Sequence, residues 1–308
     1  MSVLVFGSIN VDGVITADHL AEEGETAFAD SYDLLPGGKG ANQAVAAARA
    51  GAAVSMVAMV GPDAHAEVGL AGLRAAGVDV SGVGTGEKAT GYGAVWVRAG
   101  GGNRIMVASG ANMETRAAMV PDDRLARGDV LLLQLEVPFE ETVAIAGRAA
   151  EAGLTVMLNA APFRDLPADL LDALSVLIVN EVEAAALAGK AGLATDDPLT
   201  AVRTLARRHD LACIATLGAD GAIGWQGEAG WRSGTLAVEA VDSTGAGDAF
   251  CGAVAAALDR GLTPAEATRE GCIAGALACE KIGAQSALPD AGAIRTRLAT
   301  LPPLETLS

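Results

Sequence analysis

A short stretch around residue 245 combines a candidate catalytic base with a candidate anion-binding turn. Residues 242–250 read DSTGAGDAF and lead into an alanine-rich helix. The small residues Gly245, Ala246 and Gly247 leave three backbone N–H groups free at a helix N-terminus, where the helix dipole favours an anion. Asp248, in the first helical turn, suits a general base that deprotonates a hydroxyl attacking a phosphoryl group. A plain glycine turn with an acidic first-turn residue is the competing interpretation.

A second glycine turn precedes another predicted helix. Residues 36–43 read PGGKGANQ, and they match neither a GxxxxGK[ST] phosphate loop nor a GxGxxG dinucleotide fingerprint. Asn42 is a polar residue in the first turn of an otherwise apolar helix, after a loop whose glycine backbone lets a ligand approach closely. This stretch is either a flexible connection or a second wall of a binding site.

Polar side chains also follow apolar strand-like runs. Asn10 and Asp12 come after the first run, and Glu136 ends the run LLLQLE. Open parallel sheets bind ligands at the carboxyl ends of their strands, and alternate residues point the same way, so Asn10 and Asp12 could both bind a polyol. Each residue alone is an ordinary strand end, but together with Asn42 and Asp248 they indicate one polar pocket.

Asn180 and Glu183 follow the apolar run 176–179. Their spacing is that of a capping box, in which Asn caps a helix and Glu, three residues on, bonds back to it. The alternative is that both lie near a metal-bound phosphate, and by themselves these residues favour the cap.

The scaffold for these residues is an alternation of short apolar runs and helical stretches. Near-continuous apolar strands separated by helices predict a parallel sheet covered on both faces, hence an α/β, Rossmann-like fold. A strand-like segment over 236–241 leads into the Asp248 turn, and a capping box over 263–266 starts a later helix. The predicted strands are 3–6, 54–60, 130–135, 154–158, 176–179 and 213–216, and the predicted helices are 41–50, 63–76, 140–152, 182–188 and 245–261.

Two segments, about 13–36 and 91–109, break this rhythm. The first holds no clear helix, and the second predicts a hairpin around a turn at 100–103. We expect them to form a small β-sheet lid on a single domain over 1–308. Because an open apolar flap is a liability, we also expect this lid to pair with a second copy of the chain.

Composition narrows the function. The chain of 308 residues is 51% hydrophobic and carries a net charge of −17. That charge argues against nucleic acid and anionic membrane surfaces as partners, although a helix end or a metal ion can still bind a small phosphorylated ligand. The 4 cysteines show no CxxC spacing and the 3 histidines are scattered, which argues against a zinc site and for buried thiols in a reducing compartment. With no signal-like or membrane-spanning segment, the sequence predicts a soluble, cytoplasmic protein.

The motifs taken in order resemble the ribokinase family of PfkB-type carbohydrate kinases. They are GSINVD, PGGKGANQA, LLLQLE, NEVE, TLG, DSTGAGDAF and GAQ, from residue 4 to about residue 289. The resemblance implies a Rossmann-like kinase domain with a β lid, ATP as phosphoryl donor, Mg²⁺, and a K⁺-type monovalent cation. It also implies D-ribose as acceptor, phosphorylated at its 5-hydroxyl.

The resemblance assigns a role to each matching position. It makes Asp248 the base and the backbone of Gly245, Ala246 and Gly247 the anion hole. Groups expected to bind sugar hydroxyls are Asn10, Asp12, Gly38, Lys39, Asn42 and Glu136. Groups expected near ATP are Asn180, Glu183, Thr216, Gly218 and Gly247, with Glu183 holding Mg²⁺ through water. Groups expected to bind the monovalent cation are Asp242, Thr244, Ala278, Lys281 and Gly283.

The chain departs from the family pattern at two places. Ala287 stands where these kinases often have serine, so it offers no hydroxyl to the cation, and residues 159–162 read NAAP instead of NPAP. Other interpretations stay open. The acceptor could be another sugar, such as a ketohexose, or a nucleoside, and a non-catalytic sugar- or nucleotide-binding regulator is the alternative outside enzymes. The chain lacks the glycine fingerprint that a dinucleotide-dependent oxidoreductase needs, which argues against that class of enzyme.

Overall fold

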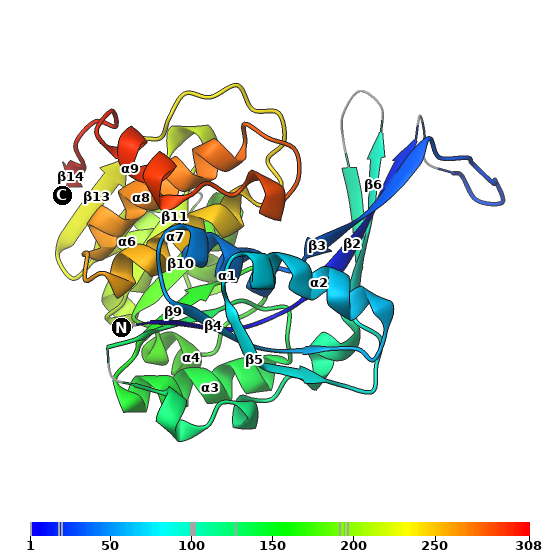
Figure 1. Ribbon diagram of the computed structural model, residues 1–308. Helices are drawn as coiled ribbons and strands as arrows, with labels where there is room; N and C mark the ends of the chain where they lie inside the picture. The colour runs from blue at the N-terminus through cyan, green and yellow to red at the C-terminus, as the bar shows by residue number, and fades with distance from the viewer. Residues whose placement is uncertain are drawn as a thin grey trace.

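A ten-stranded sheet carries most of the chain, in the order β14-β13-β12-β11-β10-β9-β8-β1-β4-β5 (Figure 1). The computed structural model describes residues 2–17, 19, 21–98, 103–126, 128–190, 192–193, 195 and 197–308. The pairs from β5 to β11 are parallel, and β12, β13 and β14 add an antiparallel edge. The strands are β1 Val3–Phe6, β4 Val54–Val60, β5 Asp79–Thr85, β8 Val130–Leu133, β9 Thr155–Asn159, β10 Val176–Asn180, β11 Ala212–Thr216, β12 Ala222–Gln226, β13 Ala229–Ser233 and β14 Glu305–Leu307.

Helices cover both faces of this sheet. Successive side chains of a strand point to opposite faces, so Val3 and Val5 pack in one core while Leu4 and Phe6 pack in the other. The first core lies against α1, α7 and α8, and the second lies against α3 and α6. The helices are α1 Lys39–Arg49, α2 Ala64–Ala75, α3 Phe139–Ala152, α4 Ala168–Ala173, α5 Glu181–Lys190, α6 Pro198–His209, α7 Ala246–Asp259, α8 Pro264–Ala278 and α9 Ala291–Leu298.

A separate four-stranded sheet, in the order β3-β2-β6-β7, projects from the main body (Figure 1). Its strands are β2 Asn10–Ala17, β3 Ser31–Gly37, β6 Gly91–Arg98 and β7 Asn103–Ala108. They come largely from the two segments that interrupt the βα rhythm, so the predicted small β-sheet is confirmed. Residues 100–102 of the turn predicted at 100–103 lie outside the described residues.

Three sequence predictions need correction. Residues 236–240 form no strand, and the N–H groups of Val241 and Asp242 donate instead to the Cys279 carbonyl. β8 ends at Leu133, so Glu136 lies in the loop beyond it. Asn10 and Asp12 do not stand at the end of β1, because the chain crosses to the small sheet at residues 7–9 and both belong to β2.

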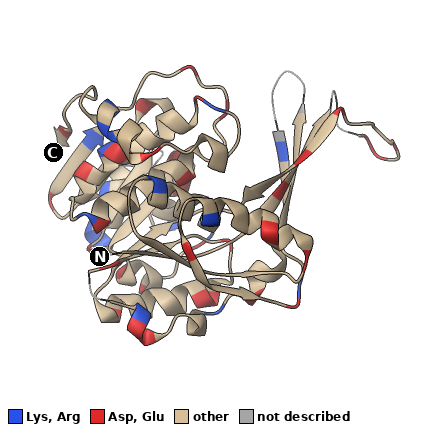
Figure 2. Cartoon of the chain, viewed as in Figure 1, with Lys and Arg blue, Asp and Glu red and all other residues tan. Residues whose placement is uncertain are grey.

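Charged side chains are spread over the molecule (Figure 2). Acidic residues lie on the main body and on the small sheet alike, so the net charge of −17 does not mark one acidic face. Within the described residues, no helix is long and apolar enough to cross a membrane. All four cysteines are unpaired, and burial raises the pKa of the Cys213 thiol to about 12.

Candidate active site

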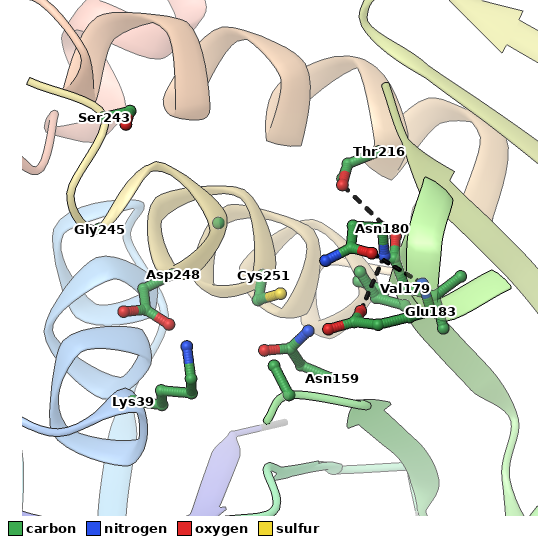
Figure 3. Close-up of a pocket in the computed structure, with 13 residues that line it drawn as sticks. Lys39, Asn159, Val179, Asn180, Glu183, Thr216, Ser243, Gly245, Asp248 and Cys251 are labelled. Carbon is green, nitrogen blue, oxygen red and sulfur yellow. Dashed lines mark hydrogen bonds between the residues drawn. The ribbon is translucent and has the colours of Figure 1, made fainter. Parts of the chain in front are cut away.

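A cavity of about 250 Å³ opens where the ends of β9, β10 and β11 meet the starts of α1 and α7 (Figure 3). It gathers residues that the sequence places far apart. Its polar lining comes from both glycine turns, from the ends of β9, β10 and β11 and from the first turn of α5. The lining residues are Lys39, Asn159, Ala161, Ile178, Val179, Asn180, Glu183, Thr216, Ser243, Gly245, Gly247, Asp248 and Cys251.

The start of α7 supplies the predicted anion-binding turn. Gly245 is the N-cap residue, and its φ of 79° is left-handed, a conformation that glycine adopts without strain. A Cβ there would also lie 3.0 Å from the Cα of Ala284. The prediction of three free N–H groups is wrong at Ala246, because its N–H donates to the Ser243 carbonyl at 3.2 Å within the turn. Gly245 and Gly247 line the cavity, whereas Ala246 does not.

Asp248 is held in place by amide donors. Asn42 Nδ2 donates to its Oδ2 at 2.9 Å, and Gln43 Nε2 donates to its Oδ1 at 2.9 Å. The Lys39 side chain points toward this carboxylate across the cavity (Figure 3). Burial raises the pKa of Asp248, while the charge of Lys39 and the two amide bonds oppose that rise. A carboxylate poised in this way suits a base.

The start of α1 brings Lys39 and Asn42 to the same place. Gly38 is its N-cap residue with φ 88°, and a Cβ there would lie 2.7 Å from the Asn10 backbone nitrogen. Only glycine allows this approach of α1 to β2. Burial works to lower the pKa of Lys39, but the charges of Asp248 and Glu136 outweigh it and raise that pKa. The ammonium therefore stays charged beside the base.

The small sheet contributes Asn10 and Asp12. Asn112 Nδ2 donates to Asn10 Oδ1 at 2.7 Å, which leaves the Asn10 amide N–H groups available. Asp12 receives no hydrogen bond from any described residue. Burial, followed by the charges of Glu136 and Asp248, raises its pKa to about 6. Its carboxylate lies between two glycines, because a Cβ at Gly37 would lie 2.1 Å from Oδ2 and a Cβ at Gly93 would lie 2.3 Å from Oδ1.

Glu136 joins the two sides. Its Oε2 accepts from Ser8 Oγ at 2.6 Å and from the Lys39 backbone N–H at 3.0 Å. The Glu136 carboxylate is therefore fixed between the start of α1 and the loop that leaves β1. Glu136 and Asp248 also raise the pKa of Asp12, so the three carboxylates lie near one another. Of the residues predicted to form one polar pocket, only Asp248 lines the cavity, whereas Asn10, Asp12, Asn42 and Glu136 do not.

Asn180 and Glu183 form the predicted capping box and also face the cavity. Glu183 Oε2 accepts from the Asn180 N–H at 2.8 Å, and Asn180 Oδ1 accepts from the Glu183 N–H at 2.8 Å. Burial raises the pKa of Glu183. Its Oε1 has no partner among the described residues, so the carboxylate offers an oxygen of the kind Mg²⁺ binds directly or through water. Thr216 lines the same cavity, whereas Gly218 does not.

The residues predicted to bind a monovalent cation are only partly brought together. Asp242 Oδ1 accepts from the Thr244 N–H and hydroxyl, and Oδ2 accepts from the Gly283 N–H at 2.9 Å. Burial opposes ionisation, but these bonds lower the pKa of Asp242. The anionic carboxylate and the loop after α8 therefore lie side by side, as a cation site requires. Ala278 is buried at the end of α8 and Lys281 is exposed.

The sequence analysis missed several polar residues of the site. Gln43, Gln134 and Gln285 are buried: Gln43 donates to Asp248 itself, Gln134 donates to Gln43, and Gln285 donates to Asn42. Asn159, the first residue of the NAAP stretch, accepts from Gln43 Nε2 at 3.0 Å and lines the cavity. Their signal in the sequence was a lone amide inside an apolar run, as for Gln134 in LLLQLE.

Comparison with known proteins agrees with this architecture. The model of the pfkB family carbohydrate kinases matches residues 1–291. The chain therefore belongs to the pfkB family of carbohydrate kinases. Within the family, it is 33% identical over 302 residues to the ribokinase of Lactococcus lactis, covering 97% of each chain.

Solved structures give the same picture. The ribokinase of Thermotoga maritima superposes with a TM-score of 0.90 at 32% identity, covering 97% of this chain and 99% of that one. The ribokinase of Arabidopsis thaliana, complexed with ribose and ATP, superposes with a TM-score of 0.87 at 29% identity, covering 96% and 98%. The ribokinase-like fold, with its larger mostly parallel sheet and its smaller sheet, is confirmed.

Proposed function

We propose that this chain is an ATP-dependent ribokinase that transfers the γ-phosphoryl group of ATP to the 5-hydroxyl of D-ribose. The observation that carries the proposal is the placement of Asp248. It is a buried carboxylate in the first turn of α7, bonded by two amides and beside a lysine. The similarity to a ribokinase complexed with ribose and ATP supports the choice of ligands.

The residues divide the work of the reaction. Asn10, Asp12, Asn42 and Glu136 bind the ring hydroxyls and aim the 5-hydroxyl at Asp248, which takes its proton. The α7 N-terminus, through the backbone N–H groups of Gly245 and Gly247 that line the cavity, stabilises the negative charge that develops on the transferred group. Such a donor set is fixed before the reaction starts, so its dipoles need no rearrangement. Lys39 adds positive charge between the two ligands.

ATP, Mg²⁺ and a monovalent cation complete the proposal. Asn180, Glu183 and Thr216 lie on the far wall of the cavity from Asp248 and would face the nucleotide phosphates (Figure 3). Glu183 would hold Mg²⁺ through water, and the ion would neutralise phosphate charge when bound. The loops joined by the Asp242–Gly283 bond would hold K⁺ beside α7.

A coupled ADP-release assay over acceptors tests the assignment. We expect kcat/KM for D-ribose to exceed that for 2-deoxyribose, fructose and adenosine by at least about tenfold, equivalent to ~1.4 kcal/mol of transition-state preference. A competitor that exceeds ribose by the same factor would move the assignment to another acceptor while the kinase chemistry stands. Absence of ATP turnover with every acceptor would favour a binding regulator.

The small sheet is proposed to bind a second copy of this chain. Its two edge strands expose large apolar side chains, among them Tyr32 at 73% and Met106 at 76%, and Phe28 in the connecting segment is 92% exposed. Exposed apolar edges of this kind are usually covered. Light scattering at micromolar concentration should give the mass of a dimer, and Met106→Glu should shift it toward the monomer. A strict monomer with and without ribose would reject the pairing.

A further inference from the structure

Two buried amides, Gln134 and Gln43, form a chain that ends on the base. Gln134, in the loop after β8, donates through Nε2 to Gln43 Oε1 at 2.7 Å. Gln43, in α1, donates through Nε2 to Asp248 Oδ1 at 2.9 Å and to Asn159 Oδ1 at 3.0 Å. The chain thus joins four elements of the main body: the β8 loop, α1, α7 and the end of β9.

The chain has a direction that the chemistry fixes. An ionised carboxylate only accepts, so Gln43 must present its NH₂ group to Asp248. That orientation leaves Gln43 Oε1 facing the other way, where Gln134 donates to it. If Gln134 presented its oxygen instead, two acceptors would face each other and Gln43 would be free to turn its own oxygen toward Asp248. Gln134 therefore reinforces the orientation of Gln43 that Asp248 requires.

Burial of the Gln43 and Gln134 amides adds little to the stability of the fold. Gln43 is 0% exposed and Gln134 is 1% exposed, and Gln134 Oε1 is a buried oxygen without a partner. A buried acceptor left without a hydrogen bond destabilises the fold, and an apolar side chain of similar size would avoid that cost. The backbone also closes around the amide, since a Cβ at Gly7 would lie 2.1 Å from Gln134 Oε1. Such a costly and tightly enclosed group indicates a role in the site.

We propose that Gln43, oriented by Gln134, is a positioning residue that holds the Asp248 carboxylate for the acceptor hydroxyl and ties it to Asn159 on the nucleotide side of the cavity. The proposal rests on the proposed kinase function, because it takes Asp248 as the base. Asn42 donates to the other carboxylate oxygen of Asp248. With both oxygens bonded, the carboxylate plane is fixed, and so are the directions of its remaining lone pairs. Gln43 acts through Asp248 and Asn159 and needs no contact with either substrate.

The test compares Gln43→Met, Gln134→Met and the double variant, with Thr268→Val as control. Thr268 is likewise buried and bonded, accepting from Trp231 Nε1 at 3.1 Å, but it lies in α8 outside the site. Loss of the Gln43 bond removes a donor that favours the ionised base. We therefore expect the acid limb of the kcat/KM profile to move up by about one pH unit. Thr268→Val should lower the melting temperature and leave the profile in place.

The double variant tests the order of action. If Gln134 works only through Gln43, adding Gln134→Met to Gln43→Met should shift the acid limb no further. Because the pKa of Asp12 is also raised, to about 6, Asp12 could contribute to the acid limb. The Gln43→Met shift is therefore also measured in an Asp12→Asn background, where it should persist. An acid limb unmoved in both single variants would overturn the proposal, as would a further shift in the double variant. Should Gln43→Met fail to fold, Gln134→Met carries the same test.

The Asp248→Asn variant distinguishes failure of the positioning role of Gln43 from failure of the proposed kinase function on which it rests. If Asp248→Asn keeps its activity, the assignment of the base fails and the amide chain loses its purpose with it. If Asp248→Asn is inactive while Gln43→Met leaves the profile unchanged, only the positioning role is rejected.

Discussion

The two sides of the site present their carboxylates in opposite ways. On the main body, Asp248 is bonded by Asn42 and Gln43 and lies beside Lys39. On the small sheet, Asp12 is also largely buried, yet no described residue donates a hydrogen bond to it. Burial raises the pKa of both groups, but only the first has protein donors and a cation that oppose the rise.

This difference indicates how the site works. A base must keep one geometry through the reaction, and the helix start with its two amides provides it. A group that recognises hydroxyls needs open acceptor positions, and Asp12 keeps both oxygens open between Gly37 and Gly93. Ligand hydroxyls would then supply the missing donors, and an acceptor that lacks one would leave a buried carboxylate unsatisfied.

The largest effect is expected at the held carboxylate. Asp248→Asn keeps the side-chain shape and removes the base, so kcat should fall by on the order of 10²–10⁴ while ATP binding is nearly unchanged. Steady-state kinetics together with calorimetric titration of ATP measures both quantities. Asp169→Asn, an exposed change in α4, is the control and should keep full activity. Retention of more than about a tenth of kcat would remove Asp248 from the mechanism.

The next effect is expected at the open carboxylate. Asn in place of Asp12 retains one acceptor oxygen and adds an NH₂ group that faces the ligand. We expect kcat/KM for ribose to fall by about 10²–10³, with ATP binding unaffected. If Asp12→Asn left kcat/KM for ribose unchanged, the open carboxylate would not be the recognition group.

The sequence predicted the individual residues of this site better than it predicted the contacts between them. Glycine turns followed by helices located Asp248 and Asn42, because local turn chemistry is written in consecutive residues. The class of the main sheet, a parallel sheet covered on both faces, was predictable from the apolar runs, since strands buried on both faces carry that pattern. The antiparallel pairing of β12, β13 and β14 was not anticipated.

Long-range contacts were outside the reach of such patterns. Gln43 and Gln134 are 91 residues apart, and their bond depends on the tertiary packing that brings the loop after β8 to α1. The placement of Asn10 and Asp12 on the small sheet depends on the chain leaving the main sheet after Phe6, where no turn signal separates β1 from β2. The segment 236–241 read as a strand from its composition, yet no neighbouring strand pairs with it.

A third prediction concerns stability. The folded-state pKa of Asp12, about 6, lies above the ordinary value of 3.8, so the folded protein binds the proton more tightly than the unfolded chain. The stability contributed by the protonated carboxyl is therefore lost as pH rises through about 6. Asp12→Asn has no such loss, and its stability advantage over the wild type should grow by about 1–2 kcal/mol between pH 5 and pH 8.

Urea denaturation at the two pH values measures this change. Asp33→Asn, at an exposed carboxylate on the neighbouring strand β3, is the matched control and should show no comparable growth. An advantage of Asp12→Asn that is the same at both pH values would mean that Asp12 titrates normally. Asp12→Asn is thus expected to stabilise the fold and to weaken recognition of ribose. Both effects follow if the hydrogen-bond donors to Asp12 come from the ligand.

The smallest effect is expected from substituting a glycine that flanks the Asp12 carboxylate. In Gly93→Ala the new Cβ would lie 2.3 Å from Asp12 Oδ1, so the carboxylate must turn, and Gly37 closes the opposite side. The backbone of β6 accepts alanine, since the φ of Gly93 is not in the left-handed region. We expect KM for ribose to rise about fivefold, with kcat changed less, because the variant misaligns a binding group and leaves the base in place. Gly147→Ala, where a Cβ meets nothing within 4 Å, is the control and should leave KM as it is. A fall in kcat as large as the rise in KM would show that the two carboxylates move together, and the contrast between a held base and an open recognition group would not stand.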